Sequence, residues 1–254
     1  MIELRDISFS YGSREVLKNI SLTLKKGELC ALVGKNGCGK TTLSRLIAGL
    51  CEPRSGEIML EKKPYKEYGS KPFARLVSFF AQKRPTPNMK TVDYVAYGRY
   101  PHCDISLKLS CSDKEAVKRA LEMTGAERFS SRNVASLSGG ERQLVYLAQA
   151  AAQDSDYMIL DEPTAFMDAA NTFAVADLLG EFSKKGKCVL SVMHDIPIAL
   201  KYFSRILVMS NGEIIYDGDP EGAVSSKSIE KAFGVSCEKI ENDYILRKIE
   251  CSEN

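Results

Sequence analysis

The stretch GKNGCGKT, Gly34–Thr41, decides the fold. It matches the pattern G-x-x-x-x-G-K-[ST], and its neighbours supply the context that this pattern needs. The apolar run ELCALVG, Glu28–Gly34, precedes it and predicts a buried strand that ends in glycine. The segment Thr41–Leu50 follows it with apolar residues at helical spacing. A strand, a glycine-rich turn and a helix in this order predict a phosphate-binding loop.

The chemistry of this loop follows from its residue types. Gly34, Gly37 and Gly39 allow the backbone to curl so that consecutive N–H groups point at a phosphate. The start of the next helix adds the positive end of its dipole. Lys40 would place a point charge on the β- and γ-phosphates, and the Thr41 hydroxyl would ligate Mg²⁺. We therefore expect phosphate groups to be bound by Gly34, Lys35, Asn36, Gly37, Cys38, Gly39, Lys40, Thr41 and Thr42. A glycine-rich turn without a ligand is the alternative.

The composition excludes several classes of protein. The chain has 254 residues, of which 44% are hydrophobic and 27% charged, and this balance is typical of a globular domain. The net charge of +2 gives no support to a nucleic-acid partner. The longest stretch without a charged residue, Gln143–Gln153, has 11 residues, whereas a membrane-spanning helix needs about 20. The first ten residues carry Glu3, Arg5 and Asp6, so we expect no secretory signal. No two of the eight cysteines have CxxC spacing, so we expect reduced thiols and no zinc site.

Outward from the loop, strand and helix patterns alternate along the chain. Further strands are predicted at residues 1–9, 16–24, 76–81, 157–160, 188–193 and 206–209, and helices at 169–184 and 196–203. This alternation predicts an α/β fold with a mostly parallel sheet. Residues 91–153 turn helical and are predicted to be a block inserted between two strands. Asn211-Gly212 predicts a hairpin turn, and about the last 35 residues are predicted to be a charged, weakly patterned tail.

An acidic pair follows one of the buried strands. Asp161 and Glu162 end the segment that begins at Tyr157. Asp161 would hold Mg²⁺ through water, while Glu162 would polarise the attacking water as a general base. A solvated strand end is the alternative for any such pair, and the upstream phosphate loop favours the functional interpretation.

A second glycine-rich signature opens the alanine-rich helix. In LSGGERQ, Leu137–Gln143, the residues Ser138, Gly139 and Gly140 would present a hydroxyl and amide hydrogens at a helix N-terminus, which is a second anion site. One compact domain rarely needs two such sites for one phosphate, so we expect this one to serve the nucleotide of another copy. With GKNGCGKT, LSGGERQ and MILDEP in this order, the chain closely resembles the ABC ATPase family from Met1 to about Gly222.

The resemblance implies a fold and a division of the chain. It implies a P-loop NTPase (RecA-like) core, an N-terminal antiparallel β subdomain and an inserted helical subdomain. The ATP-binding domain would span residues 1–222, with a core of about 1–90 and 154–222, a helical subdomain of about 91–153 and a short tail at 223–254.

The resemblance also assigns roles to single residues. Gln82 would touch Mg²⁺ and the attacking water and would sense the transporter partner. His194 would contact the γ-phosphate, and Asp168 would link the two nucleotide sites across a dimer. Tyr11 would stack on adenine. We expect the other histidine, His102, to be a surface or packing residue.

Three positions depart from the family pattern. Phe166 and Met167 stand where the family usually has a small residue and a leucine, so packing across the dimer is expected to differ. Gln149 stands where the family usually carries arginine, which puts a helix-anchoring contact in question.

The expected partners follow from the resemblance. One phosphate loop and one signature imply a head-to-tail homodimer, and the lack of membrane spans implies separate permease subunits, served indirectly by a substrate-binding protein. The chain would then sit on the cytoplasmic face of the membrane, docked through the helical block and the Gln82 loop. YGRYPH, Tyr97–His102, resembles importers of iron-siderophores, haem and cobalamin. The alternatives are that Arg99 and Tyr100 merely cap a helix and pack, and that the chain is a soluble ABC ATPase of iron–sulfur cluster assembly.

Overall fold

A six-stranded sheet runs through the centre of the computed structural model, which describes residues 1–103 and 108–249. The strand order is β10-β9-β3-β8-β7-β6; all neighbours are parallel except β9 and β10, which form an antiparallel hairpin. The predicted α/β class with a mostly parallel sheet is therefore confirmed. The strands are β3 (Leu29–Val33), β6 (Val77–Phe80), β7 (Tyr157–Asp161), β8 (Cys188–Val192), β9 (Arg205–Ser210) and β10 (Glu213–Gly218).

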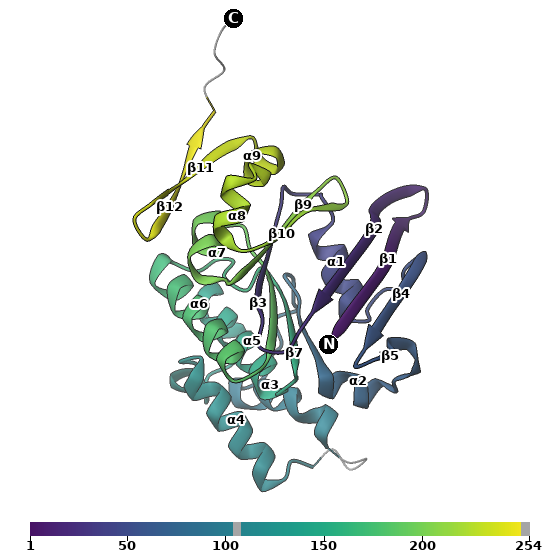
Figure 1. Cartoon of the computed structure of the whole chain (residues 1–254). Coiled ribbons are helices and arrows are strands. Elements are labelled where there is room, and N and C mark those ends of the chain that lie inside the picture. Colours follow the sequence, from purple (N-terminus) through teal and green to yellow (C-terminus); the bar gives the residue numbers. More distant parts are fainter. Residues whose placement is uncertain (104–107, 250–254) are drawn as a thin grey trace, which may run out of the picture.

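A second, antiparallel sheet lies beside the first, with strand order β2-β1-β4-β5 (Figure 1). Its strands are β1 (Ile2–Tyr11), β2 (Arg14–Leu24), β4 (Ser55–Leu60) and β5 (Lys63–Pro64). Helix α1 (Lys40–Ile47) packs between the two sheets, because Leu43 and Leu46 are fully buried in one cluster with residues of both. The helix that leaves the phosphate loop is thus held from two sides.

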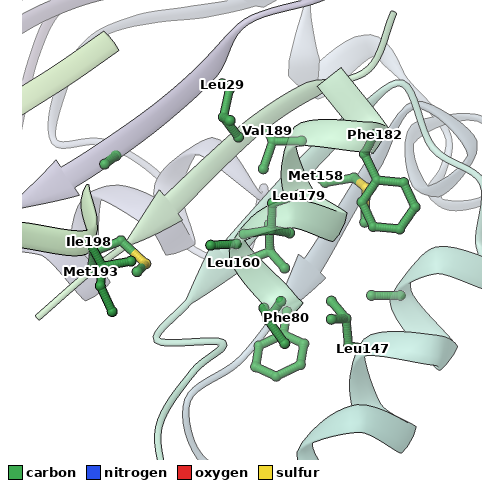
Figure 2. Packing of buried hydrophobic residues seen from close by; sticks show 14 of the residues in the cluster. Leu29, Phe80, Leu147, Met158, Leu160, Leu179, Phe182, Val189, Met193 and Ile198 are labelled. Carbon is green, nitrogen blue, oxygen red and sulfur yellow. The ribbon is translucent and has the colours of Figure 1, made fainter. Parts of the chain in front are cut away.

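Helices cover the other face of the parallel sheet. Figure 2 shows how Leu160 of β7 and Val189 of β8 pack against Leu179 of α6, with Phe80 of β6 close to Leu147 of α5. Because the strands are buried on both faces, their sequences are continuously apolar rather than alternating. The helices are α2 (Ser70–Leu76), α3 (Thr91–Ala96), α4 (Cys111–Met123), α5 (Gly139–Ala152), α6 (Ala169–Lys184) and α7 (Ile196–Tyr202), with the 3₁₀ turns η1 (Tyr65–Glu67), η2 (Tyr97–His102), η3 (Glu127–Phe129) and η4 (Val134–Ser136).

Between β6 and β7 the described elements are the helices and 3₁₀ turns from α3 to α5, joined by loops. This block forms the lower end of the molecule in Figure 1. Its YGRYPH segment is η2, whose Gly98 comes so close to α5 that an added Cβ would lie 2.3 Å from the Gln149 carbonyl oxygen. Arg99 is buried and donates hydrogen bonds to Asp113 (2.9 Å) and to the Ala152 carbonyl (2.8 Å). Packing within the block therefore explains the glycine and arginine of this motif. Residues 104–107 of the predicted block lie outside the described residues.

The prediction of a weakly patterned tail is wrong for the described residues up to 249. They form α8 (Pro220–Ser225), α9 (Ser228–Phe233), β11 (Val235–Ile240) and β12 (Asp243–Lys248), at the end of the molecule opposite α4 (Figure 1). Ala223, Ile229 and Tyr244 are buried in the main core cluster, and Lys201 of α7 holds Asp243 at 2.6 Å. Helices of six residues are too short to display a helical period, so the sequence pattern did not predict α8 and α9.

Residues 250–254 of the predicted tail, including Cys251, lie outside the described residues. Among the helices that are described, none has the length and apolar character needed to cross a bilayer.

Candidate active site

The phosphate loop joins the carboxyl end of β3 to α1. Gly39 directly precedes α1 with φ 113°, in a region that side chains rarely adopt, and Gly34 packs so tightly that a Cβ would lie 2.3 Å from the Met209 carbonyl oxygen. The Lys40 ammonium folds back over the loop and donates to the carbonyls of Gly34 (2.6 Å) and Lys35 (3.1 Å). This cation is only 6% exposed, and a bound anion would replace the two carbonyls as its partner.

A cavity of about 680 Å³ opens over this loop. It brings together residues that are far apart in the sequence: the end of β1, the loop itself, and the segments after β6, β7 and β8. Ten of the residues predicted for the site line it: Tyr11, Asn36, Gly37, Gly39, Lys40, Thr41, Thr42, Gln82, Glu162 and His194. Because β6, β7 and β8 are parallel, their carboxyl ends meet at one edge, where such sheets place their ligands.

Asp161 lies under the cavity floor rather than in its lining. The Thr41 hydroxyl donates to its carboxylate at 3.4 Å, and the side chain is 1% exposed. Burial raises the pKa of Asp161, whereas the Thr41 hydrogen bond opposes that rise. Hydroxyl and carboxylate oxygens fit Mg²⁺, which takes one or two protein ligands and completes its shell with phosphate and water. Among the described residues, no group of three or more His, Cys, Asp or Glu side chains could hold a metal ion.

Glu162 is clamped from both sides. The Gln82 amide donates to one carboxylate oxygen at 2.6 Å, and the His194 ring nitrogen Nε2 contacts the other. Glu162 has φ 56°, a left-handed conformation that costs about 1 kcal/mol or more in a residue with a side chain. That strain turns the carboxylate away from Asp161, its neighbour on β7, and into the cavity with His194.

Three loop residues take positions that the sequence did not distinguish. Gly34 is buried below the cavity, and Lys35 contributes its carbonyl to Lys40. The Cys38 side chain packs into the core between the sheets, and burial raises the pKa of its thiol. The Cys38 backbone also bonds within the fold, because its N–H donates to the Lys35 carbonyl (3.3 Å) and its carbonyl accepts from the Gly212 N–H (3.1 Å).

The signature residues Ser138, Gly139 and Gly140 do not line the cavity. Ser138 precedes α5 in a capping box: its hydroxyl accepts from the Glu141 N–H (3.3 Å), and Glu141 accepts from the Ser138 N–H (2.8 Å). The latter bond lowers the pKa of Glu141. The Ser138 hydroxyl accepts in this box, and its own hydrogen bond to the Glu141 carboxylate also lowers the pKa of Glu141.

Phe166 covers this helix start. An added Cβ on Gly139 would lie 3.6 Å from the Phe166 Cβ, yet the Phe166 side chain is 86% exposed. Like Glu162 it has a positive φ, 65°. Asp168, predicted to link two sites across a dimer, directly precedes α6 in the single chain, where its carboxylate accepts from the Asn171 N–H at 2.8 Å. The exposed Phe166 ring therefore lies beside the two glycines at the start of α5.

Sequence reasoning missed two residues of the cavity, Arg14 and Val16. Arg14 pairs with Tyr11 across the β1–β2 turn. Strand alternation carried the signal, because residues two apart on β2 share a face, and Tyr11 was already placed on that side. Arg14 adds a cation to the end of the cavity that holds the exposed Tyr11 ring.

Comparisons with known proteins agree with this geometry. The family model described as ABC transporter matches residues 17–165. The ferric enterobactin transport ATP-binding protein of Escherichia coli (strain K12) is 35% identical and covers 91% of this chain and 86% of its own length. A probable siderophore transport system ATP-binding protein of Bacillus subtilis (strain 168) is 34% identical, with 93% and 87% covered. The solved structure of a dimeric bacterial ABC transporter cassette has a TM-score of 0.78 at 25% identity and covers 87% of this chain and 99% of its own.

Proposed function

The chain belongs to the ABC transporter family, and from that premise we propose that it hydrolyses ATP to drive import of an iron–siderophore chelate through separate permease subunits. The observation that carries the proposal is the cavity within one chain, which the Lys40 loop lines together with Glu162, Gln82 and His194. Residues 1–222 would form the ATP-binding domain, with 91–153 as its helical subdomain.

Each side chain has a task in the cavity. Lys40 releases the Gly34 and Lys35 carbonyls and binds the β- and γ-phosphates, while the loop N–H groups bind the phosphate oxygens. The Tyr11 ring stacks on the adenine base. Glu162 accepts the proton of the attacking water with a carboxylate lone pair that the single contacts from Gln82 and His194 leave free. These two contacts hold the carboxylate in place inside the cavity.

Thr41 and Asp161 would hold Mg²⁺, with Gln82 at the rim of the same cavity. When bound, the ion supplies positive charge that offsets the charge on the phosphates. The chain's own contribution is to fix the two oxygen ligands through the burial of Asp161 and the hydrogen bond from Thr41.

A second copy supplies the remaining contacts. Ser138, Gly139 and Gly140 of one copy would donate to the γ-phosphate in the cavity of the other, and two-fold symmetry would form two such sites. The likeness to a dimeric cassette supports this arrangement. ATP would close the dimer, because the nucleotide binds both copies only in the closed state.

The cargo proposal is supported by relatives of nearly full length, which are described as ferric enterobactin and siderophore transport proteins. The iron–sulfur assembly alternative is not favoured, because these relatives are transport proteins. We place the chain on the cytoplasmic face of the membrane, attached to its permease, with a separate substrate-binding protein delivering the chelate.

Transport by proteoliposomes tests the proposal. The chain is reconstituted with its permease, and uptake of ⁵⁵Fe-siderophore is compared with uptake of haem, cobalamin and free manganese. We expect ATP-dependent uptake of the iron chelate, and none with the matched Glu162→Gln variant. Siderophore uptake that is independent of ATP, or uptake of another cargo alone, would contradict it.

A further inference from the structure

Arg84 bridges two parts of the molecule that the active site uses. It follows Gln82 by two residues, and its guanidinium donates to the carbonyls of Phe79 (3.2 Å) and Ala81 (3.3 Å) in its own segment. The same group reaches α5, where it donates to the Gln149 side-chain oxygen (3.2 Å) and lies 3.5 Å from the Tyr146 carbonyl oxygen. One side chain thus joins the Gln82 segment to the helix that begins at Ser138.

The surroundings hold the guanidinium in place. Its central carbon lies 4.1 Å from the centroid of the Phe80 ring and 5.5 Å from that of Tyr146, both within range of a cation–π contact. No carboxylate in the described parts of the chain pairs with Arg84, and burial lowers its pKa. Carbonyl oxygens, one amide oxygen, two ring faces and a hydrogen bond with the Tyr94 side chain therefore surround the charge, because a buried cation without partners is costly.

Further hydrogen bonds connect α5, the Gln82 segment and Glu162. The Tyr146 hydroxyl donates to the Pro85 carbonyl (3.3 Å), so α5 holds residues 84 and 85 at two points. From the same helix, the buried Gln143 amide donates to the Glu162 backbone carbonyl (3.4 Å). Gln82 donates to the Glu162 carboxylate from the other side. Helix α5, the Gln82 segment and Glu162 are thus mutually connected.

We propose that Arg84 is a positioning residue that ties the Gln82 segment to α5, so that the contact of Gln82 with Glu162 is linked to the placement of Ser138 at the start of α5. Gln149 stands where the family pattern has arginine, and in this chain its side-chain oxygen accepts a hydrogen bond from the Arg84 guanidinium. This inference rests on the roles proposed above for Glu162, Gln82 and Ser138.

An exchange of the two side chains tests the proposal. Four proteins are compared with the parent: Arg84→Gln, Gln149→Arg, the double variant Arg84→Gln/Gln149→Arg, and Lys83→Gln as the control. Lys83 is the adjacent cation, is exposed, and undergoes the same loss of charge. The measurements are the kcat and KM for ATP of the isolated chain, the dissociation constant of a fluorescent ATP analogue, and the thermal unfolding midpoint.

Arg84→Gln is expected to lower kcat about 10- to 100-fold, since small misplacements of catalytic groups have effects of this size. Its affinity for the ATP analogue should stay within about threefold, because no cavity residue changes. Gln149→Arg should also lower kcat, because it places a second cation beside Arg84. The double variant should recover kcat to within about threefold of the parent, with a coupling that single changes cannot produce.

Three results would overturn the proposal. One is a folded Arg84→Gln variant with the parent's kcat, and another is an equal loss in Lys83→Gln. The third is a double variant that regains the parent's unfolding midpoint without regaining kcat, since Arg84 would then be purely structural. Should Arg84→Gln not fold, Gln149→Ala, which removes a single acceptor, must lower kcat about threefold with unchanged ATP-analogue affinity.

Failure of this inference and failure of the proposed function are separable. If the parent chain hydrolyses ATP and Glu162→Gln does not, the active site stands whatever Arg84 does. If Glu162→Gln hydrolyses ATP like the parent, the roles on which Arg84 is argued are wrong, and the exchange loses its basis.

Discussion

Two helices of the molecule begin at glycine-rich turns, and only one of them opens onto a cavity. At the start of α1, Lys40 is buried and the loop lines a space that Glu162 and His194 also line. At the start of α5, Ser138 and Gly139 are exposed, and only Phe166 lies over them. The first turn therefore meets the side chains that act with it inside one chain, whereas the second turn lies outside the cavity of its own chain. This difference supports the proposal that each ATP site combines the α1 turn of one copy with the α5 turn of another.

The largest effect should come from the α1 side. Lys40→Ala removes the one buried cation of the loop, and we expect ATP hydrolysis to fall by about 10³-fold or more, with weaker nucleotide binding. Arg45→Ala is the matched control, because Arg45 is an exposed cation on the same helix. Steady-state hydrolysis and nucleotide titration check this, and unchanged turnover in Lys40→Ala would refute the loop assignment.

Glu162→Gln should come next. It removes the general base but keeps the shape of the side chain, so we expect hydrolysis to fall by roughly 10²–10³-fold while ATP affinity is retained. The glutamine can still bond Gln82 and His194, so the fold should be preserved. A variant that loses ATP binding and hydrolysis together would place Glu162 in nucleotide binding instead.

The α5 side can be tested with an internal control. Ser138 and Ser110 each form a capping box, Ser138 at the start of α5 and Ser110 at the start of α4. Their hydroxyl–amide distances are 3.3 and 3.1 Å, respectively. Replacing either by alanine should lower the free energy of unfolding by about 1 kcal/mol. Ser138→Ala alone should also lower kcat, by about tenfold, since only this hydroxyl would reach a nucleotide. Equal hydrolysis by the two variants would argue against the second site.

Phe166 offers an optical test, because the chain contains no tryptophan. In a Phe166→Trp variant on the Glu162→Gln background, ATP should shift the emission to shorter wavelength as the ring, 86% exposed in the single chain, becomes buried. Phe173→Trp, at a 42% exposed ring on α6, is the comparison. Phe166→Ala should weaken ATP-driven association about tenfold, close to 1.4 kcal/mol. Emission at Phe166→Trp that ignores ATP, although the protein dimerises, would place the ring outside the interface.

The smallest effect concerns stability and pH. Burial raises the pKa of Asp161, so the folded chain binds this proton more tightly than the unfolded chain. Ionised Asp161 therefore lowers the free energy of unfolding at neutral pH, and this penalty fades as the pH falls through the raised pKa. Asp161→Asn should unfold at a slightly higher temperature than the parent at pH 7, with a gain that shrinks toward acid pH, while Mg²⁺-dependent hydrolysis is lost. A lower unfolding temperature at pH 7 would contradict the sign.

The sequence predicted what short, contiguous motifs determine. The ABC family, the ATPase cassette and the transport class follow from Gly34–Thr41, Leu137–Gln143 and the acidic pair, and the matches confirm them. The residues after 223 escaped because their buried positions, such as Ala223 and Tyr244, follow no period in helices and strands of six residues. Contacts between distant segments escaped as well.

Cys38 and Arg84 illustrate the second limit. Both lie beside motif residues, and nothing local shows that the Cys38 thiol packs into the core or that Arg84 crosses to Gln149. The side on which a loop residue points depends on tertiary packing, which the motif does not encode. In the sequence, Gln149 is visible only as a departure from the family pattern. The arginine that donates to it, Arg84, lies 65 positions away.

The most direct measurement is the mass of Glu162→Gln in solution by sedimentation, with and without ATP. If two copies enclose the nucleotide, ATP should convert the 28.1 kDa chain to twice that mass, ADP should not, and adding Ser138→Arg should restore the single-chain mass. A protein saturated with ATP that remains at 28.1 kDa would contradict the shared site.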